Sequence, residues 1–346
     1  MTYMLQEILA SPDILASLEK ENRHVLTALG AELRQKQIRS VTFAGRGTSD
    51  HASIYGQYLL SIIGGVCAGL AIPSAISLYG SQIDYGESLV IAVSQSGSAA
   101  DALAVLECAR QSGAVTLAIT NDPQSPLAKA AQWHLFCHAD EEKSVAATKT
   151  FTSQLALLYL LAAYWFERED MKQYFAQLPR KLNAWLSEAV PQMESFVRPY
   201  RYMEDGFILS RGITYPIALE TMLKVQETCY VKLKAYSSAD FYHGPLAQVD
   251  RRTPVIVYAP SGAALQENLA MAEKIRSLGN EPLVVTDSEQ VFQQASSAFL
   301  LPKAEDELAA PLFFAVFAQL FAQALCLERG GDPDHPRNLK KVTVTR

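Results

Sequence analysis

The sequence contains no paired-cysteine pattern. Its five cysteines are an odd number, and no two of them are spaced as Cys-x-x-Cys. The disulfide framework of a small secreted protein would need such pairs. We therefore expect reduced thiols in a cytoplasmic protein.

The sequence also lacks a stripe of basic residues and a leader segment. Lys and Arg number 30 against 36 Asp and Glu, which gives a formal net charge of −6, so no nucleic-acid partner is expected. Glu7, Asp13 and Glu19 near the N-terminus do not fit the basic, apolar and small-residue order of a signal peptide. The protein is expected to remain in the cytoplasm.

Charged residues are absent from Ala52 to Ser81, a stretch long enough to span a membrane. A Gly-Gly pair and Pro73 interrupt it, and interrupted apolar runs are typical of core elements. We expect a buried helix, a turn and a buried strand there. The apolar segment Pro311 to Leu327 is likewise expected to be a core helix, so no membrane partner is predicted.

No cofactor is expected from the glycine and histidine patterns. Residues 45–50, with the sequence GRGTSD, lack the third glycine of the dinucleotide fingerprint, and residues 51–83 contain no Asp or Glu to bind a ribose. His134 and His138 flank Cys137, but no further Cys or His completes a four-ligand shell. We therefore predict neither a nicotinamide cofactor nor a metal.

A chain of 346 residues is long enough for two globular units. A helical segment over residues 3–36, with Ser11-Pro12-Asp13 as its cap and first turn, precedes short apolar strands that alternate with helices. This alternation predicts parallel βαβ units and an α/β fold with helices on both faces of each sheet. Strands are expected at residues 39–44, 89–93, 115–119, 133–136, 207–210 and 255–257.

The same order recurs in the second half of the chain. Arg211-Gly212 lies 165 residues after Arg46-Gly47, and Ser261-Gly262 lies 165 residues after Ser96-Gly97. One shared offset predicts a duplicated αβα domain rather than stacked short repeats. We expect an N-terminal helical segment, a first domain, a helical connector, a second domain and a C-terminal tail at residues 1–36, 37–170, 171–200, 201–330 and 331–346.

Two strand-to-helix junctions are candidates for binding a phosphate. The strand at 89–93 runs into Ser94-Gln95-Ser96-Gly97-Ser98 and then into a helix. A hydroxyl-rich turn before a helix N-terminus presents N–H donors and a positive dipole end to an anion. Helix capping is the alternative role for a single serine. Thr48 and Ser49 offer hydroxyls at a second junction, which a doubly wound sheet places beside the first.

A helix in the second half carries Glu220, Lys224 and Glu227 at spacings of four and three, and therefore on one face. The three side chains form either a solvated, salt-bridged surface or a carboxylate base with a lysine that holds its charge state. His243 follows in the turn from Asp240 to Pro245, either as a solvated side chain or as an acid-base group.

Six ordered motifs resemble the tandem sugar isomerase (SIS) family, and most closely the isomerase half of glucosamine-fructose-6-phosphate aminotransferase and stand-alone SIS-type glucosamine-6-phosphate deaminases. The motifs are Gly47-Thr48-Ser49, Ser94-Gln95-Ser96-Gly97, Val145-Ala146-Ala147-Thr148-Lys149, Tyr215-Pro216-Ile217-Ala218-Leu219-Glu220, Tyr242-His243-Gly244-Pro245-Leu246 and Pro336-Arg337-Asn338-Leu339. The resemblance covers nearly the whole chain and implies two tandem three-layer αβα SIS domains.

The resemblance also implies which residues bind a sugar phosphate. They are Gly47, Thr48, Ser49, Ser94, Gln95, Ser96, Gly97, Ser98, Glu142, Val145 and Ala147. Two departures remove hydroxyl groups from this set. The family usually continues its phosphate motif as Gly-Glu-Thr, where this chain has Gly97-Ser98-Ala99, and Ala147 stands where the family has a serine.

By the same resemblance, Glu227 would move a proton between sugar carbons C1 and C2, with Lys224 as its electrostatic support. His243 would reach in from a partner subunit to open the sugar ring, which implies a homodimer with shared active sites. Lys341 in the C-terminal tail would meet the open-chain sugar.

The chain begins Met1-Thr2-Tyr3, without the N-terminal cysteine nucleophile of a glutaminase half. Without that ammonia supply, we expect an isomerising deaminase that converts glucosamine 6-phosphate and water to fructose 6-phosphate and ammonia. Three alternatives remain: a synthase-type isomerase, a deglycase of amino-acid-linked fructosamine phosphates, and a non-catalytic sugar-phosphate sensor.

Overall fold

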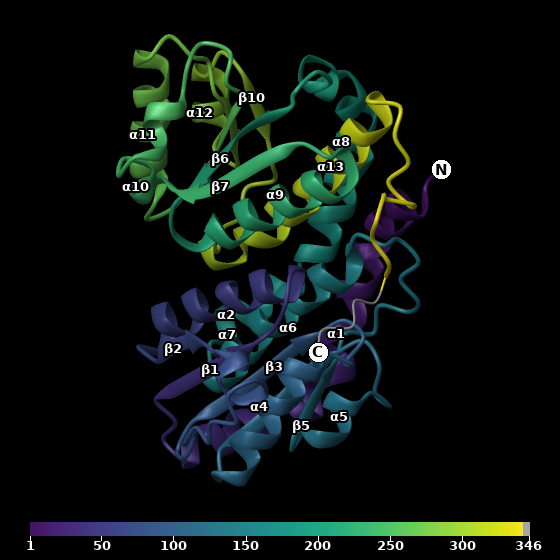
Figure 1. Ribbon diagram of the computed structural model, residues 1–346, viewed down its shortest axis with the longest axis vertical. Coiled ribbons are helices and arrows are strands. Elements are labelled where there is room, and N and C mark those ends of the chain that lie inside the picture. Colours follow the sequence, from purple (N-terminus) through teal and green to yellow (C-terminus); the bar gives the residue numbers. More distant parts are fainter. Residues whose placement is uncertain (342–346) are drawn as a thin grey trace. The chain divides into compact units, whose positions relative to one another are not determined.

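The computed structural model describes residues 1–341 as two compact units built from strands and helices (Figure 1). Both units contain a parallel sheet with flanking helices, so the predicted α/β fold with two tandem αβα domains is confirmed. We name each unit after its sheet. The first domain comprises Ala10–Glu142, Ala147–Pro179 and the tail from Lys340, and the second comprises Met1–Leu9, Lys143–Ala146 and Arg180–Leu339.

The first domain has five parallel strands in the order β2-β1-β3-β4-β5. This is a doubly wound order, in which the chain moves from β1 to one edge and then crosses back to the other side. The strands are β1 (Ser40–Ala44), β2 (Cys67–Leu70), β3 (Leu89–Ser94), β4 (Val115–Thr120) and β5 (Trp133–Phe136). The helices are α1 (Tyr3–Gln35), which continues from the second domain, α2 (Thr48–Gly64), α3 (Pro73–Ser77), α4 (Ala100–Gln111), α5 (Pro126–Ala130), α6 (Lys149–Trp165) and α7 (Glu169–Phe175).

The second domain repeats this winding, because its order β10-β9-β8-β6-β7 follows the same pattern when its strands are counted from β6. The strands are β6 (Asp205–Ser210), β7 (Lys232–Ser237), β8 (Val255–Ala259), β9 (Leu283–Thr286) and β10 (Ala298–Leu300). The helices are α8 (Leu178–Val197), α9 (Tyr215–Cys229), α10 (Ser238–Phe241), α11 (Leu265–Ser277), α12 (Glu289–Gln294) and α13 (Ala310–Glu328), with 3-10 turns at Arg198–Tyr200, Gly212–Thr214, Pro245–Gln248 and Glu307–Ala309. Equal winding supports the duplication that the 165-residue offset predicts.

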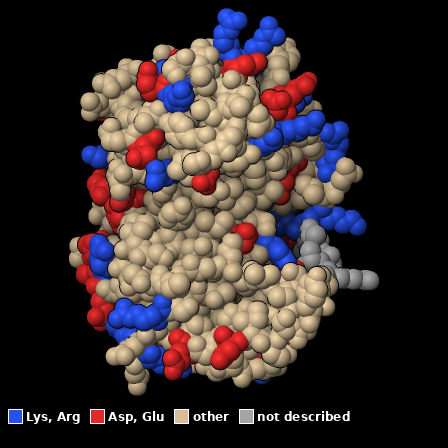
Figure 2. Space-filling model, turned by 60° about the vertical axis from the view of Figure 1, so that its left-hand side comes forward, with Lys and Arg blue, Asp and Glu red and all other residues tan. Residues whose placement is uncertain are grey.

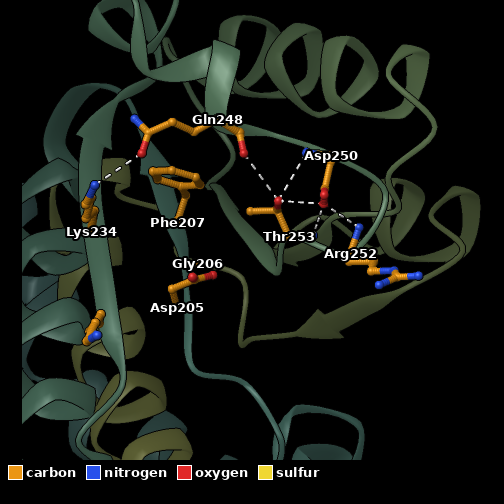
Figure 3. Close-up of a pocket in the computed structure, with 9 residues that line it drawn as sticks. Asp205, Gly206, Phe207, Lys234, Gln248, Asp250, Arg252 and Thr253 are labelled. Atoms are coloured by element: carbon orange, nitrogen blue, oxygen red, sulfur yellow. Dashed lines mark hydrogen bonds between the residues drawn. The ribbon is translucent and has the colours of Figure 1, made fainter.

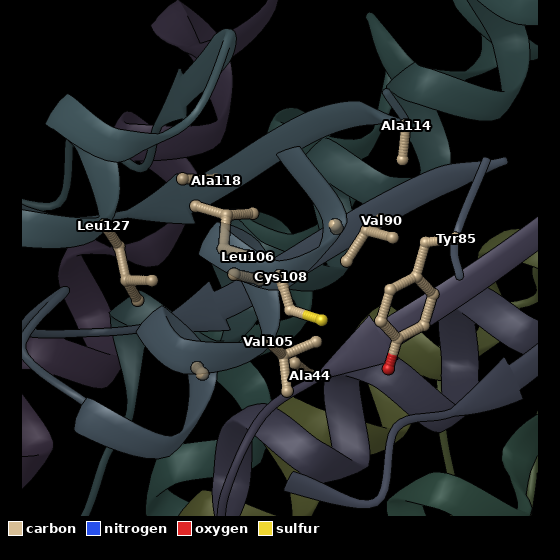
Figure 4. Packing of buried hydrophobic residues seen from close by; sticks show 12 residues of the cluster. Ala44, Tyr85, Val90, Val105, Leu106, Cys108, Ala114, Ala118 and Leu127 are labelled. Carbon is tan, nitrogen blue, oxygen red and sulfur yellow. The ribbon is translucent and has the colours of Figure 1, made fainter. Parts of the chain in front are cut away.

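The core of the first domain lies where α4 covers the central strands. Strands β3 and β4 are buried along their whole length, as parallel strands covered on both faces are. Val105 and Leu106 of α4 pack against Val90 of β3 and Ala118 of β4 in one apolar cluster (Figure 4). Helices α2 and α6 pack on each other in this domain, and α9 and α13 do so in the second.

The strand expected to be buried within residues 52–81 is an edge strand instead. Strand β2 pairs only with β1, so one of its sides has no neighbouring strand. Cys67 is exposed and Leu70 is 40% exposed. The absence of charge there therefore does not reflect burial.

Helix α1 spans the predicted helical segment almost completely, but it has no boundary inside it. It runs unbroken from Tyr3 to Gln35 with Pro12 inside it, so the expected cap and first turn at Ser11-Pro12-Asp13 is wrong. Met4 and Ile8, which precede the proline, are fully buried. Burial of this apolar first segment outweighs the helix-breaking tendency of an internal proline.

Among the described residues, one helix is long and apolar enough to cross a membrane. It is the segment Glu307–Glu328, and 94% of its most apolar window is buried inside the protein. Phe313, Phe314 and Phe317 on this helix are all buried. This burial is that of a core helix, as the sequence predicts for residues 311–327.

The surface carries charges of both signs. Figure 2 shows acidic and basic side chains interspersed on the face that it draws. Many are exposed ion pairs within one element or loop, such as Arg168 with Asp170 at 2.6 Å and Lys172 with Glu169 at 3.2 Å. Such exposed pairs contribute little to stability.

Replacing Leu106 by alanine is expected to lower the free energy of unfolding by about 2–5 kcal/mol, because it leaves a cavity in the α4 core. Leu103→Ala, at a partly buried position of the same helix, should cost clearly less. Urea unfolding of both variants provides the measurement. Equal losses would contradict the central place of Leu106 in this cluster.

Candidate functional site

Two loops leave the carboxyl ends of the neighbouring strands β1 and β3. Residues 45–47 connect β1 to α2, and residues 95–99 connect β3 to α4. Strands β1 and β3 lie where the winding of the sheet reverses, which is the place where doubly wound sheets bind ligands. The structure thus brings both predicted phosphate-binding segments to the carboxyl ends of neighbouring strands of one sheet. We call these two loops, together with Ser94 at the end of β3 and Thr48 and Ser49 at the start of α2, the cradle.

The serines after β3 are arranged as donors to a ligand. Gly97 donates its N–H to Ser94 Oγ at 3.2 Å, and Ser98 donates its N–H to Ser96 Oγ at 3.3 Å. Because each hydroxyl oxygen already accepts a hydrogen bond, its own proton is free to be donated to an anion. The hydroxyl of Ser98 instead donates to the carbonyl of Ser96 at 3.3 Å.

Gly97 fixes the shape of this loop. Its φ is +63°, and a Cβ there would lie 2.1 Å from Oγ of Ser125. Its carbonyl accepts the N–H of Leu127 at 3.1 Å, which ties the loop to α5. The N-cap of α4 is Ala99, and no side chain of the described residues caps this helix, so the capping alternative for the serines is wrong.

Ser49 is the buried hydroxyl of the β1 loop. It lies in the first turn of α2, whose N-cap Gly47 also lacks a side-chain cap. Ser49 Oγ accepts a hydrogen bond at 3.2 Å from Nε2 of Gln154, a buried residue of α6. Oε1 of Gln154 accepts no hydrogen bond from the described residues. Sequence reasoning missed Gln154, although a glutamine within such an apolar helix is a usable signal.

Glu142 and Lys341 form a second cluster in the first domain. The buried Glu142 carboxylate accepts hydrogen bonds from Thr148 and Thr150, through both their N–H and hydroxyl groups, and from Lys341 Nζ at 2.5 Å. Burial raises the pKa of Glu142, but Lys341 and the threonine donors outweigh it and hold the pKa below its usual value. The half-buried Val145 and Ala147 lie in the loop between these ligands.

Helix α9 of the second domain carries a buried charge cluster. Lys224 Nζ lies 2.6 Å from Glu227 Oε2 and 3.4 Å from Glu220 Oε1. The side chains of Lys224 and Glu220 are essentially inaccessible, whereas Glu227 is 22% exposed. The solvated-surface alternative is therefore wrong for Glu220 and Lys224. Glu227 is the member of the cluster that a ligand can reach.

His243 lies on the surface of the second domain. The predicted turn from Asp240 to Pro245 contains the end of α10 and the start of a 3-10 turn, so only its middle is a turn. The N–H of His243 donates to the carbonyl of Asp240 at 3.0 Å, and the residue is exposed. The two domains therefore hold different candidate groups: the cradle, Glu142 and Lys341 in the first, and the α9 cluster and His243 in the second.

Among residues 1–341, no group of three or more His, Cys, Asp or Glu side chains is placed to hold a metal ion. His134 forms a 2.8 Å hydrogen bond from Nε2 to Thr120 Oγ1. His138 has a positive φ of 49° just beyond the end of β5. The ring of His138 packs against that of Phe136, with 4.2 Å between the ring centroids.

A cavity of about 350 Å³ lies at the amino ends of β6 and β7, away from the carboxyl ends of these strands (Figure 3). Four of its polar side chains bond to one another in pairs: Lys234 donates to Gln248 at 3.2 Å, and Thr253 donates to Asp250 at 2.9 Å. We interpret these bonds as supports of the loop from residue 248 to 253.

The family of the chain follows from its match to the SIS domain model, which covers residues 33–164 and 206–329. The chain belongs to the SIS domain family. The isomerizing glutamine-fructose-6-phosphate aminotransferase of Pyrococcus horikoshii is 34% identical over 358 residues, an alignment that covers 99% of this chain and 58% of that protein. The chain therefore spans little more than half the length of this curated relative.

Two solved structures are similar over nearly the whole chain. A candidate phosphosugar isomerase from Silicibacter pomeroyi has a TM-score of 0.87 and 30% identity, and the match covers 96% of this chain and 100% of that one. The C-terminal domain of glucosamine-fructose-6-phosphate aminotransferase from Francisella tularensis has a TM-score of 0.84 and 26% identity, over 97% and 98% of the two chains. The SIS resemblance deduced from the motifs is thereby confirmed.

Glu142→Gln is expected to lower the free energy of unfolding at pH 7 by at least about 1.5 kcal/mol, because its hydrogen bonds lose their charge assistance. The pKa of Glu142 is lowered in the folded state, so its contribution is present above the unfolded pKa of about 4.3 and is lost as the pH falls below it. Urea unfolding at pH 7 and at lower pH provides the measurement. The difference in free energy of unfolding between the wild type and Glu142→Gln should become smaller as the pH falls.

The exposed neighbour provides the control for this prediction. Glu141→Gln should leave stability nearly unchanged at both pH values. A difference between Glu142→Gln and the wild type that stays constant down to pH 3 would contradict the assigned direction of the pKa shift.

Proposed function

We propose that the protein is an isomerising deaminase of an amino-sugar phosphate, which converts glucosamine 6-phosphate and water to fructose 6-phosphate and ammonia. The main support is the α9 cluster, in which the inaccessible Lys224 contacts both Glu220 and the partly exposed Glu227. Membership of the SIS family and the sugar-phosphate relatives support the substrate class.

The charges of the α9 cluster suit a proton carrier. Both carboxylates contact the same lysine, since Lys224 Nζ lies 3.4 Å from Glu220 and 2.6 Å from Glu227. Glu220 is inaccessible, which leaves Glu227 as the group that exchanges a proton with a ligand. Lys224 orients the Glu227 carboxylate through its 2.6 Å contact and stabilises its charge.

The proposed reaction assigns one role to each candidate group. The cradle holds the phosphate, His243 assists ring opening, and Lys341 meets the open-chain sugar. Glu227 takes the proton from C2 of the open-chain aldehyde and returns it to C1. The C1 carbonyl thereby becomes a CH2OH group, its hydroxyl proton coming by exchange from the C2 amine, and that amine becomes a C=N imine. Water then adds at C2, ammonia leaves with its nitrogen, and a ketone remains.

The alternatives differ in what they require. A synthase-type isomerase runs the same proton transfer in the other direction and needs an ammonia supply, whereas a deglycase needs the same groups with a larger amine substituent. A sugar-phosphate sensor requires the cradle alone. The inaccessible Lys224 and Glu220 favour an enzyme over a sensor, since buried charges are costly and a binding module has no need of them.

We also propose a homodimer in which His243 serves the site of the partner subunit. His243 is exposed at the end of a short helix, where it is accessible to a second chain. The first domain also exposes large apolar side chains near β2, namely Ile72 at 67%, Leu78 at 71% and Tyr79 at 82%. Such side chains are typical of surfaces that a partner covers.

Glu227→Gln is expected to reduce ammonia release from glucosamine 6-phosphate by about 10²–10⁴-fold, because loss of a general acid-base group raises the barrier. Its affinity for the sugar phosphate should stay within about threefold, since the cradle is unchanged. A coupled ammonia assay and calorimetric binding provide the two measurements. Unchanged turnover would exclude Glu227 as the proton carrier, and no ammonia release from the wild type would contradict the deaminase assignment.

Mixing two inactive variants tests the shared site. His243→Ala and Glu227→Gln subunits should each be inactive, but a heterodimer regains one intact site, so an equal mixture should recover about a quarter of wild-type activity. Native mass spectrometry verifies that heterodimers form. Heterodimers without activity would place His243 in its own subunit or outside the chemistry.

A further inference from the structure

Arg46 links the two loops of the cradle. It follows β1 and precedes Ser49 in the chain, and its Nε and Nη2 lie 3.2 and 2.6 Å from Oδ2 of Asp101. Asp101 is buried in the first turn of α4, three residues after Ser98. The guanidinium group therefore joins the β1 loop to the helix that begins after the β3 loop.

The ion pair leaves part of the guanidinium group available. Both hydrogen bonds go to one oxygen of Asp101, and no other described residue binds Nη1 of Arg46. The side chain of Arg46 is 52% exposed, whereas that of Asp101 is 8% exposed. A buried carboxylate thus holds an arginine whose remaining donors face solvent at the edge of the cradle.

The cradle lacks a charged donor among its other members. Ser49, Ser94 and Ser96 offer neutral hydroxyls, Ala99 has none, and the hydroxyl of Ser98 is used by the Ser96 carbonyl. A phosphate monoester carries between one and two negative charges near pH 7, and guanidinium groups bind it with charge-assisted, often bidentate hydrogen bonds.

The second domain shows what its own copy of this loop binds. There, 165 residues later, the N–H groups of Ser261 and Ala263 donate to Asp287 Oδ1 at 2.6 Å and to Glu307 Oε2 at 2.7 Å. Two carboxylates of the protein thus occupy the duplicated loop. The first-domain loop has no such internal anion among the described residues, since Ser98 donates its N–H to a serine hydroxyl.

We propose that Arg46 is a further ligand of the substrate phosphate and that Asp101 is a positioning residue that orients it. The inference rests on the proposed function, because it takes the cradle to bind a sugar phosphate. It adds a specificity, because Arg46 contacts the phosphoryl group rather than the sugar. Loss of the Arg46 guanidinium group therefore weakens the binding of phosphorylated sugars and of inorganic phosphate alike.

Calorimetric titration with glucosamine 6-phosphate and with inorganic phosphate tests this proposal, together with KM and kcat. Arg46→Gln should raise the dissociation constants of both ligands by about tenfold or more, and it should raise KM with little change in kcat. Arg46→Lys should recover part of the loss, because lysine keeps the charge without the planar fork. Asp101→Asn should also weaken the binding of both ligands, but by less than Arg46→Gln does.

Two further variants make the outcomes distinct. Arg211 occupies the duplicated position and pairs with Glu267 of α11 at 2.8 Å, so Arg211→Gln removes a similar ion pair and should bind phosphate like the wild type. Ser96→Ala tests the cradle itself. If Ser96→Ala weakens the binding of phosphate and Arg46→Gln does not, Arg46 is not a phosphate ligand, and the assignment of the cradle as the phosphate site stands. If neither variant weakens the binding of phosphate, the assignment of the cradle as the phosphate site and the proposed function are both wrong.

Folding of the variants is checked by thermal unfolding. If Arg46→Gln is unfolded, Arg46→Lys decides, since its ammonium can still pair with Asp101. A folded Arg46→Lys that binds phosphate as tightly as the wild type overturns the proposal, and one that binds it at least about threefold more weakly supports it. Weaker binding by Arg211→Gln to the same extent as Arg46→Gln would also overturn it, because the effect would then not be specific to the cradle.

Discussion

The reversal of winding between β1 and β3 is the constraint on which the candidate phosphate site depends. It places two strand-to-helix loops side by side without any side-chain contact having to draw them together. The β3 loop can then expose backbone N–H groups, because no side chain caps α4, whereas Ser49 and Asp50 of α2 donate their N–H groups to the carbonyls of Arg46 and Gly47. The fold thus supplies the position and the polarity of the cradle, and the serines supply the hydroxyl donors.

The duplicated domain uses the same loop for a different purpose. In the second domain, Asp287 and Glu307 accept the N–H groups that correspond to those of the β3 loop. A Cβ on Gly262 would meet the Glu307 carboxylate, so the loop is closed around its own anion. Duplication therefore provides an internal comparison: carboxylates of the protein accept the N–H groups of the second-domain loop, whereas in the first-domain loop Ser98 donates its N–H to a neutral serine hydroxyl.

Sequence patterns predicted what is local in this structure. The spacing of Glu220, Lys224 and Glu227 placed them on one helix face, because the helical period is a local property. Their burial was not predictable, since it depends on the packing of α9 against α13 and the sheet. The edge position of β2, the helical turns before Pro12 and the pairing of Arg46 with Asp101, 55 residues away, also depend on tertiary neighbours.

The proposed binding and proton-transfer functions rest on different charged clusters. In the first domain, Arg46 pairs with Asp101 and Lys341 pairs with Glu142, so a phosphate bound there, as proposed, would meet cations that each already contact a carboxylate. Hydrogen-bond geometry then governs its affinity more than long-range attraction does. In the second domain, Lys224 contacts the inaccessible Glu220 and the partly exposed Glu227. Under the proposed function, phosphate binding would use the serines and Arg46 of the first domain, and proton transfer would use the Glu227 carboxylate of the second.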